Sequence, residues 1–442
     1  MNLKNAFLRG TLLLTITGII SRIMGFFYRI FLANTIGAEG MGIYQLIFPI
    51  YAVCFSLCAS GIETSVSKLT AEKTALGKHQ DALNILKTAL FLTGILSICC
   101  SLFIYFQADF LAAYFLKDPR CEELLKILAI TIPFGTIQSC ICGYYFGVHK
   151  AGIPAFAQLI EQGIRMLSVC FLYHLFITNQ IPVSPKIAVI GLVIGELCSL
   201  LVTLTCFSFQ FKPNTPRQHC SNYTHFKEIL TLAIPLTISR ICINLLASLE
   251  ATMIPNALKA YGMDTSTALS IYGVLTGMAL PFILFPNALT SSISLMLLPR
   301  VSESQAKGQI DTLKNTIRKT FSFCIFLGCG CLLFFLIFGN YLGSLVFSSE
   351  LAGKFITILA WLCPFLYLNT TLNSILNGLG LTNLTFTNGI LSIFLRIGFV
   401  FWGIPVWGIQ GYLFGLLASQ LFSTVLSCFF LYRVFHFKNL KC

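Results

Sequence analysis

Long, predominantly apolar segments recur along the whole chain and are separated by short polar stretches. Each segment is long enough for an α-helix that crosses a bilayer core of about 30 Å. A transmembrane β-barrel would instead show alternating segments of about ten residues. The pattern predicts an all-α polytopic membrane protein with twelve transmembrane spans: 8–33, 41–66, 85–107, 124–148, 152–178, 186–211, 228–256, 266–298, 320–340, 353–379, 383–404 and 407–433.

Short motifs that recur in order indicate that the chain contains two similar halves. The Ser-Arg-Ile triplet at 21–23 recurs at 239–241. An offset of 231 residues relates Gly147 to Gly378 and Arg165 to Arg396. A Gly-x-x-x-Gly element also occurs twice, at Gly191/Gly195 and at Gly411/Gly415. Six spans in each half make the repeats parallel, and transporters built in this way bind their substrate between the halves. The Gly-x-x-x-Gly elements indicate close helix packing.

Charge in the polar stretches predicts the domain boundaries and the orientation. The most polar stretch, 212–226, is expected to be a cytoplasmic linker between a six-helix lobe at 1–211 and a second lobe at 227–442. If both termini are cytoplasmic, 18 of the 29 lysines and arginines lie inside, against six outside. This asymmetry follows the positive-inside rule and favours cytoplasmic termini. The first apolar run has no small-residue cleavage site and is expected to be a retained span.

Composition excludes a soluble enzyme. Charged residues make up 10% of the chain, against about 25% in soluble domains. The net charge of +13 fits anionic membrane lipid better than nucleic acid, because no soluble domain carries a basic patch. The 18 cysteines contain no CxxC pair and no zinc spacing, so neither a metal nor a cofactor is expected. No phosphate loop or catalytic constellation is present, which favours a transporter over an enzyme.

Arginines inside apolar spans are the first candidate site. An arginine at the centre of a membrane helix costs roughly 2.5–3.5 kcal/mol, and such residues usually face a bundle interior or a water-filled cavity. Arg22 lies near the middle of the first span, and Arg29 lies seven residues further along the same face. Arg240 and Arg396 are also near mid-span. Guanidinium groups bind phosphate through paired hydrogen bonds, so these four arginines are the predicted substrate-binding residues. Alternatively, Arg29 reaches the outer interface.

Acidic residues inside the spans are few. Glu250, with Glu63 as a second candidate, is predicted to couple transport to an ion or a proton. The alternative for Glu250 is that it only neutralises an arginine. Glu161 and Arg165 stand four residues apart, the spacing at which side chains meet on one face of a helix, and are predicted to form a structural ion pair.

Four motifs in the first 80 residues resemble a known family. They are F-L-R-G-T at 7–11, S-R-I-M-G-F-F-Y-R at 21–29, G-A-E-G-M-G-I-Y at 37–44 and V-S-K-L-T-A-E at 66–72. They look like the stage V sporulation protein B group, which belongs to the exporter superfamily of multidrug, oligosaccharidyl-lipid and polysaccharide transporters. The similarity extends over nearly the whole chain. It implies a MATE-like fold with two lobes around a central cavity.

The resemblance implies a flippase in the bacterial inner membrane. Its substrate would be an undecaprenyl-pyrophosphate-linked saccharide, such as lipid II or another peptidoglycan or polysaccharide precursor, moved by alternating access. In the related lipid II flippases, arginines of the S-R-x-x-G-F motif line the cavity, which assigns that role to Arg22 and, with a weaker match, to Arg29. Cell-wall synthesis enzymes are implied partners, and sporulation is an implied setting.

Two other functions fit the same sequence. A cation-coupled multidrug antiporter would depend on Glu250 or Glu63, although the first span contains no acidic residue. A scaffold that recruits wall-synthesis enzymes would not need the intramembrane arginines, but the short loops offer it little surface.

Overall fold

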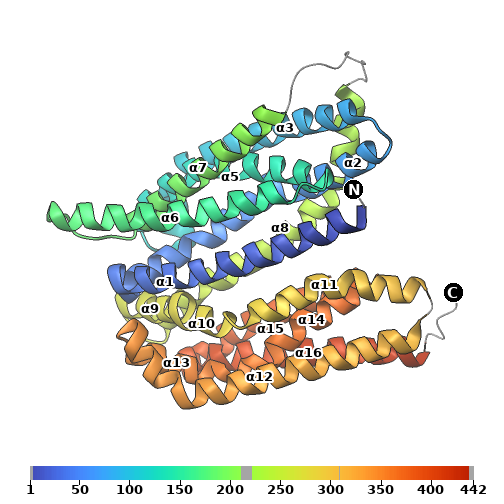
Figure 1. Cartoon of the computed structure of the whole chain (residues 1–442). Coiled ribbons are helices and arrows are strands. Elements are labelled where there is room, and N and C mark those ends of the chain that lie inside the picture. The colour runs from blue at the N-terminus through green and yellow to red at the C-terminus, as the bar shows by residue number, and fades with distance from the viewer. Residues whose placement is uncertain (1–2, 211–221, 308, 438–442) are drawn as a thin grey trace. The chain divides into compact units, whose positions relative to one another are not determined.

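The computed structural model describes residues 3–210, 222–307 and 309–437, and every regular element among them is a helix (Figure 1). The α-helices are α1 (Leu3–Phe55), α2 (Gly61–Ala75), α3 (His79–Phe106), α4 (Ala108–Phe110), α5 (Cys121–Gly147), α6 (Gly152–Thr178), α7 (Lys186–Gln210), α8 (Asn222–Ala260), α9 (Thr265–Gly273), α10 (Leu280–Leu284), α11 (Asn287–Ala306), α12 (Ile310–Phe347), α13 (Glu350–Leu359), α14 (Cys363–Gly378), α15 (Thr382–Trp407) and α16 (Ile409–Phe437). Short π or 3₁₀ turns are η1 (Ser56–Ser60), η2 (Leu111–Leu116), η3 (Val274–Ala279) and η4 (Ala360–Leu362). The predicted all-α class is confirmed.

Eleven helical segments of the described chain are long and apolar enough to span a membrane. One of them, Leu13–Ala75, has 63 residues, or about 95 Å of helix, which is enough for two passes. Gly37 interrupts it with a φ of 72°, a left-handed conformation that glycine adopts without strain. If this segment is counted as two passes, the number of membrane-spanning segments in the described chain equals the twelve predicted spans.

The predicted span at 266–298 is wrong at its end. The helix stops at Leu284, and a new helix, α11, begins after Pro286. Proline has no N–H to donate to the preceding turn, so the helix cannot continue through it. At the other end of the segment, the Asp264 carboxylate accepts a hydrogen bond from the Thr267 amide and caps α9. Hydrogen bonds from the side chain of Thr267 and then from its backbone amide lower the pKa of Asp264.

The helices form two compact units. Unit 1 contains the chain up to Tyr28 together with Ile43–Ser248, and unit 2 contains Arg29–Gly42 together with the chain from Leu249 onward. The first part of α8 therefore belongs to unit 1 and its last part to unit 2. Most of the predicted linker lies outside the described residues, and the division into lobes at 1–211 and 227–442 stays a prediction.

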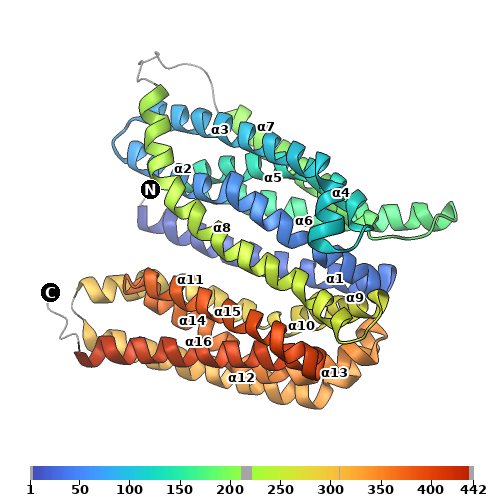
Figure 2. The ribbon, with the colours of Figure 1, turned by 180° about the vertical axis from the view of Figure 1, so that it is seen from behind.

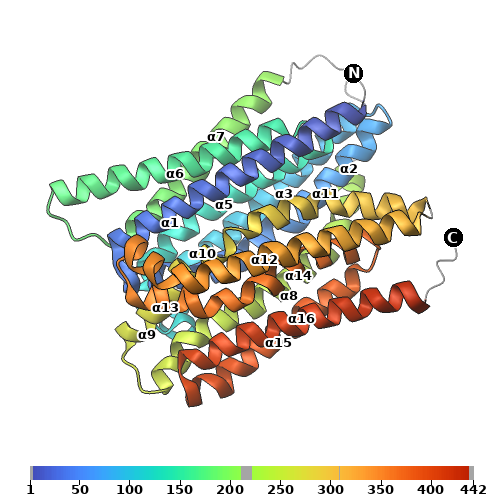
Figure 3. The ribbon, with the colours of Figure 1, turned by 60° about the horizontal axis from the view of Figure 1, so that its bottom comes forward.

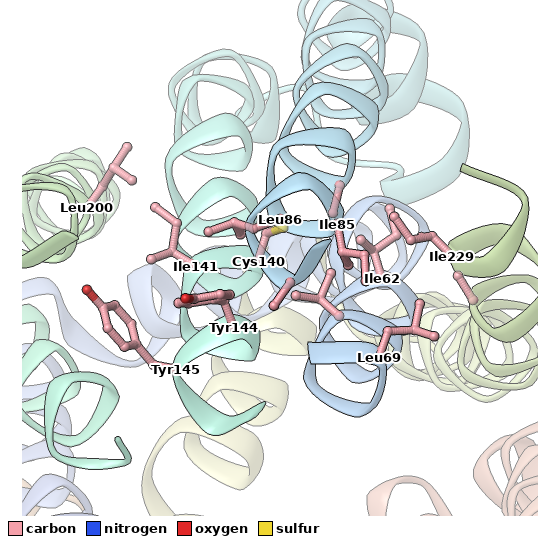
Figure 4. Packing of buried hydrophobic residues seen from close by; sticks show 14 residues of the cluster. Ile62, Leu69, Ile85, Leu86, Cys140, Ile141, Tyr144, Tyr145, Leu200 and Ile229 are labelled. Atoms are coloured by element: carbon pink, nitrogen blue, oxygen red, sulfur yellow. The ribbon is translucent and has the colours of Figure 1, made fainter. Parts of the chain in front are cut away.

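Each unit encloses its own apolar core. In unit 1, α2, α3, α5 and α7 run alongside one another (Figure 2). Figure 4 shows the core between them, where Ile62, Leu86 and Ile141 pack around the thiol of Cys140. In unit 2, α14 packs between α11, α12 and α16, with Leu372 and Leu376 at the centre. Burial of Cys140 agrees with the behaviour of cysteine as a small apolar residue.

Glycines at repeat-related positions allow the helices of each unit to approach closely. A Cβ atom on Gly147 would lie 2.7 Å from the Ser67 carbonyl oxygen of α2. A Cβ atom on Gly378 would lie 2.9 Å from the Leu298 carbonyl oxygen of α11. Ser67 and Leu298 are also 231 residues apart, so the same contact between a glycine and a backbone carbonyl occurs once within each unit.

The two Gly-x-x-x-Gly elements also allow two helices to approach closely. Gly195 on α7 faces the Glu161 carbonyl oxygen of α6, and Gly415 on α16 faces Phe399 of α15. Figure 3 shows α15 and α16 side by side. Both elements therefore mark close packing of the last two helices of a repeat.

Replacing either glycine of the repeated contact should destabilise the protein. Gly147→Ala and Gly378→Ala each place a methyl group against backbone, with an expected loss of about 1–3 kcal/mol. Gly94→Ala and Gly330→Ala are matched controls, because a Cβ at either position meets nothing within 4 Å. Thermal unfolding in detergent measures the difference. Equal midpoints for all four variants would contradict the repeated contact.

Candidate functional site

Arg22 and Arg240 both belong to unit 1 and both have exposed side chains. In the described chain, neither has a carboxylate within the 4.0 Å of an ion pair. No acidic residue precedes Glu39 in the sequence, so that part of α1 offers Arg22 no carboxylate. Unit 1 therefore carries two arginines, at equivalent repeat positions, that are available to an anion.

Arg29 and Arg396 belong to unit 2. The Arg29 side chain is exposed, whereas Arg396 on α15 is partly buried, with its Nε atom 2.9 Å from Oε1 of Glu250 on α8. The four predicted substrate-binding arginines are thus divided between the units, two in each. Their convergence on one substrate stays a prediction.

Glu250 is buried at the meeting point of three helices. Its carboxylate pairs with Arg396 and accepts a hydrogen bond of 2.8 Å from the hydroxyl of Tyr412 on α16. Only 6% of its side chain is exposed. A buried carboxylate needs such partners because its desolvation is unfavourable. Glu250 therefore neutralises an arginine in this conformation, and its predicted coupling role stays a prediction.

Arg165 forms the corresponding cluster of unit 1. It pairs with Glu161 of its own helix, and it lies 3.9 Å from Oε1 of Glu196 on α7. The Tyr51 hydroxyl of α1 donates a hydrogen bond of 3.4 Å to Glu196. The Glu161–Arg165 pair is thus present with the spacing that the sequence indicates. The cluster holds two carboxylates against one guanidinium.

Glu63, the second coupling candidate, lies elsewhere in unit 1. The Ser139 hydroxyl of α5 donates a hydrogen bond of 2.5 Å to its carboxylate. The positive charge of Arg240 on α8 also acts on this carboxylate. One turn further along α8, Asn244 donates hydrogen bonds to Ser56 and to the Ala52 carbonyl. Glu63 is therefore held by α5, and among the described residues it forms no ion pair with Arg240.

The repeat extends to buried polar contacts. The Gln138 side-chain amide on α5 donates a hydrogen bond of 2.5 Å to the hydroxyl of Ser199 on α7. The residue 231 positions later, Asn369 on α14, donates a hydrogen bond of 2.8 Å to the side chain of Gln420 on α16. Arg165 and Arg396 occur at the same offset, and each is held by a carboxylate from another helix. The two units thus stabilise their helices with equivalent polar contacts.

Sequence reasoning missed the partners that come from other helices, namely Tyr51, Glu196 and Tyr412. No spacing along the chain connects Tyr412 with Glu250. Glu196 is one of the four acidic residues inside the predicted spans, and it follows Gly195, which brings α7 close to the arginine-bearing helix, but no spacing assigns it to Arg165. Among the described residues, no group of three or more His, Cys, Asp or Glu side chains could hold a metal ion.

Comparisons with known proteins match this architecture. A family profile described as "Polysaccharide biosynthesis protein" matches residues 7–305, and a second, "MatE", matches residues 234–402. Stage V sporulation protein B of Bacillus subtilis (strain 168) is 29% identical over 432 residues, or 96% of this chain and 83% of the relative. Lipid II flippase MurJ of the same species is 23% identical over 343 residues, or 74% of this chain and 63% of the relative.

The fold is that of a solved flippase. The structure of lipid II flippase MurJ in an inward closed conformation superposes with a TM-score of 0.72 and 14% sequence identity. The superposition covers 95% of this chain and 87% of that chain. The chain therefore has the fold of that protein, and the eleven candidate spans of the described chain together with the family matches indicate a multi-pass membrane protein.

Removing one partner of the Glu250–Arg396 pair should be far more harmful than removing both. Arg396→Leu leaves a buried carboxylate without its counter-charge and should lower stability by about 3 kcal/mol or more. The double variant Arg396→Leu/Glu250→Leu should recover most of this loss. Thermal unfolding of the purified protein tests the cycle, and the exposed pair of Glu350 and Lys354 is the control whose removal leaves the midpoint unchanged. If the loss of stability in the double variant equals the sum of the losses in the two single variants, the two groups do not interact.

Proposed function

The chain belongs to the polysaccharide biosynthesis protein family, and on that premise we propose that it is a flippase for undecaprenyl-pyrophosphate-linked saccharides. Alternating access would move the head group across the bacterial cell membrane while the polyprenyl tail remains in lipid. In this proposal both termini are cytoplasmic, and the saccharide belongs to a peptidoglycan or polysaccharide precursor. The protein is then a transporter and not an enzyme.

The observation that carries the proposal is the pair Arg22 and Arg240. Both lie at membrane depth by sequence, both are exposed, and neither has a carboxylate within 4.0 Å in the described chain. Placing two such cations in lipid would be costly, so they are expected to face a water-filled path. Two guanidinium groups suit a pyrophosphate, because each can donate two parallel hydrogen bonds to its oxygens.

The remaining candidates receive supporting roles. Arg29 extends the cationic surface of α1 toward one membrane face. Arg396 is occupied by Glu250 in this conformation. Binding of a proton or a cation to Glu250 would weaken that pair and release the guanidinium, which links an ion gradient to phosphate binding. Glu63 would act in the same way on Arg240. Cell-wall synthesis enzymes would supply the substrate on one side and consume it on the other, with sporulation as one setting.

A cation-coupled multidrug antiporter is the second candidate, and the MatE match over residues 234–402 favours it. The buried carboxylate of Glu250 would then be the coupling site, and the substrates would be organic cations. Such substrates need acidic and aromatic partners. The first helix has no acidic residue before Glu39, which favours the anionic substrate.

Transport should depend on both arginines. In proteoliposomes with a fluorescent undecaprenyl-pyrophosphate saccharide, Arg22→Ala/Arg240→Ala should lower translocation at least about 100-fold, because two charge-assisted contacts of roughly 1.5–3 kcal/mol each are lost. Arg22→Lys keeps the charge but not the paired hydrogen bonds and should retain partial activity. Lys354→Ala, which removes an exposed charge, is the control.

Two results separate the candidates. Full translocation by the double arginine variant, in a folded and correctly inserted sample, would contradict the proposed role. Efflux of cationic dyes that requires Glu250, without any movement of the lipid-linked saccharide, would support the antiporter instead.

A further inference from the structure

A groove of about 580 Å³ lies within unit 2, in the volume range typical of ligand pockets. Residues of α12, α14 and α16 line it. α14 packs against both outer helices and forms the floor with Leu372, which belongs to the apolar core of the unit. Figure 3 shows α12, α14 and α16 in this arrangement. The groove is thus built on the packed core and not on loops.

The two charged groups of the groove both lie at one end of its α12 wall. Lys314 and Arg318 stand one turn apart near the beginning of the helix, and both are exposed. Phe321 and Ser322 line the groove one turn further on. Ile317 lines the groove between the two cations, and at 1.5 Å per residue Phe321 lies about 10 Å beyond Lys314. One end of the groove is therefore cationic, and its body is apolar.

The positions along the chain place the cationic end at a membrane interface. The apolar segment of α12 begins at residue 320, directly after the two cations. On the opposite wall, Tyr432 lies near the end of α16, and Cys428 lies one turn deeper. Tyrosine is enriched at head-group depth in membrane proteins. Both walls thus change from polar to apolar in the same direction.

In the described part of the chain, no carboxylate lies within 4.0 Å of either cation. Within the described residues, neither Lys314 nor Arg318 forms an ion pair, although other exposed lysines such as Lys307 and Lys354 do. Two like charges one turn apart on a helix repel each other, so an anion between them would stabilise both. The groove offers a phosphate site joined to an apolar channel.

We propose that this groove binds one anionic phospholipid, with the phosphate between Lys314 and Arg318 and an acyl chain along Phe321, Leu372 and Cys428. A lipid joins a charged head to an apolar chain in the same order as the groove. With the proposed orientation, the site belongs to the cytoplasmic leaflet, where anionic lipids attract basic segments. The site does not depend on which substrate the protein transports.

Native mass spectrometry of the purified, delipidated protein tests this site. Titration with dioleoylphosphatidylglycerol should show one lipid that binds more tightly than dioleoylphosphatidylcholine. Lys314→Gln/Arg318→Gln should weaken phosphatidylglycerol binding by about 30-fold, because each basic group contributes about a fivefold effect. Phosphatidylcholine binding should not change. Lys319→Gln/Arg433→Gln removes two exposed charges from the same end but outside the groove and should have little effect.

A second variant tests the apolar part. Ser322→Trp fills the groove without altering charge and should weaken binding of both lipids. Three outcomes would overturn the proposal. Equal losses of phosphatidylglycerol binding in the two double variants would indicate diffuse surface charge. Tighter binding of undecaprenyl phosphate than of phosphatidylglycerol would make the groove a substrate-tail site, and a lipid-independent dimer that Ser322→Trp disrupts would make it a subunit interface.

Discussion

Charge compensation in a medium without water governs this structure. An arginine inside an apolar helix requires a carboxylate, a polar ligand or an aqueous path, because lipid offers none of them. Arg165 and Arg396 are compensated within the protein by Glu161, Glu196 and Glu250. Tyrosine hydroxyls of α1 and α16 donate hydrogen bonds to two of these carboxylates, Glu196 and Glu250. Among the described residues, Arg22 and Arg240 have no carboxylate within 4.0 Å, and these are the arginines that we propose bind an anionic substrate.

The two units satisfy this constraint with equivalent packing. Repeat-related glycines bring α5 against α2 and α14 against α11 at the same backbone contact. In each unit a partly buried arginine lies beside a carboxylate from another helix, from α7 in unit 1 and from α8 in unit 2. The two clusters differ in charge, since unit 1 holds two carboxylates and unit 2 holds one. The packing of the two units is therefore symmetric, whereas the charge of their arginine clusters is not. A transporter in which only one half responds to an ion needs such a difference in charge.

Much of the fold could be predicted because membrane helices are apolar throughout and repeats keep their spacing. The Glu161–Arg165 pair could also be predicted, since both residues lie on one helix at a spacing of four. The partner of Arg396 could not, because α8 and α15 meet only in the folded unit and no periodicity links them. The end of the span at Leu284 was missed because hydropathy averages over Pro286, whereas hydrogen bonding does not. Hydropathy likewise reveals no groove, which depends on three helices packing together.

The central claim is that Arg22 and Arg240 recognise the pyrophosphate of a lipid-linked saccharide. Its most direct test is the binding affinity of the purified protein for a short-chain polyprenyl-pyrophosphate saccharide, compared with the same compound in which a neutral linker replaces the pyrophosphate. The native protein should strongly prefer the pyrophosphate compound, and Arg22→Ala/Arg240→Ala should lose that preference. Equal affinity for both compounds in the native protein, or an unchanged preference in the variant, would contradict it.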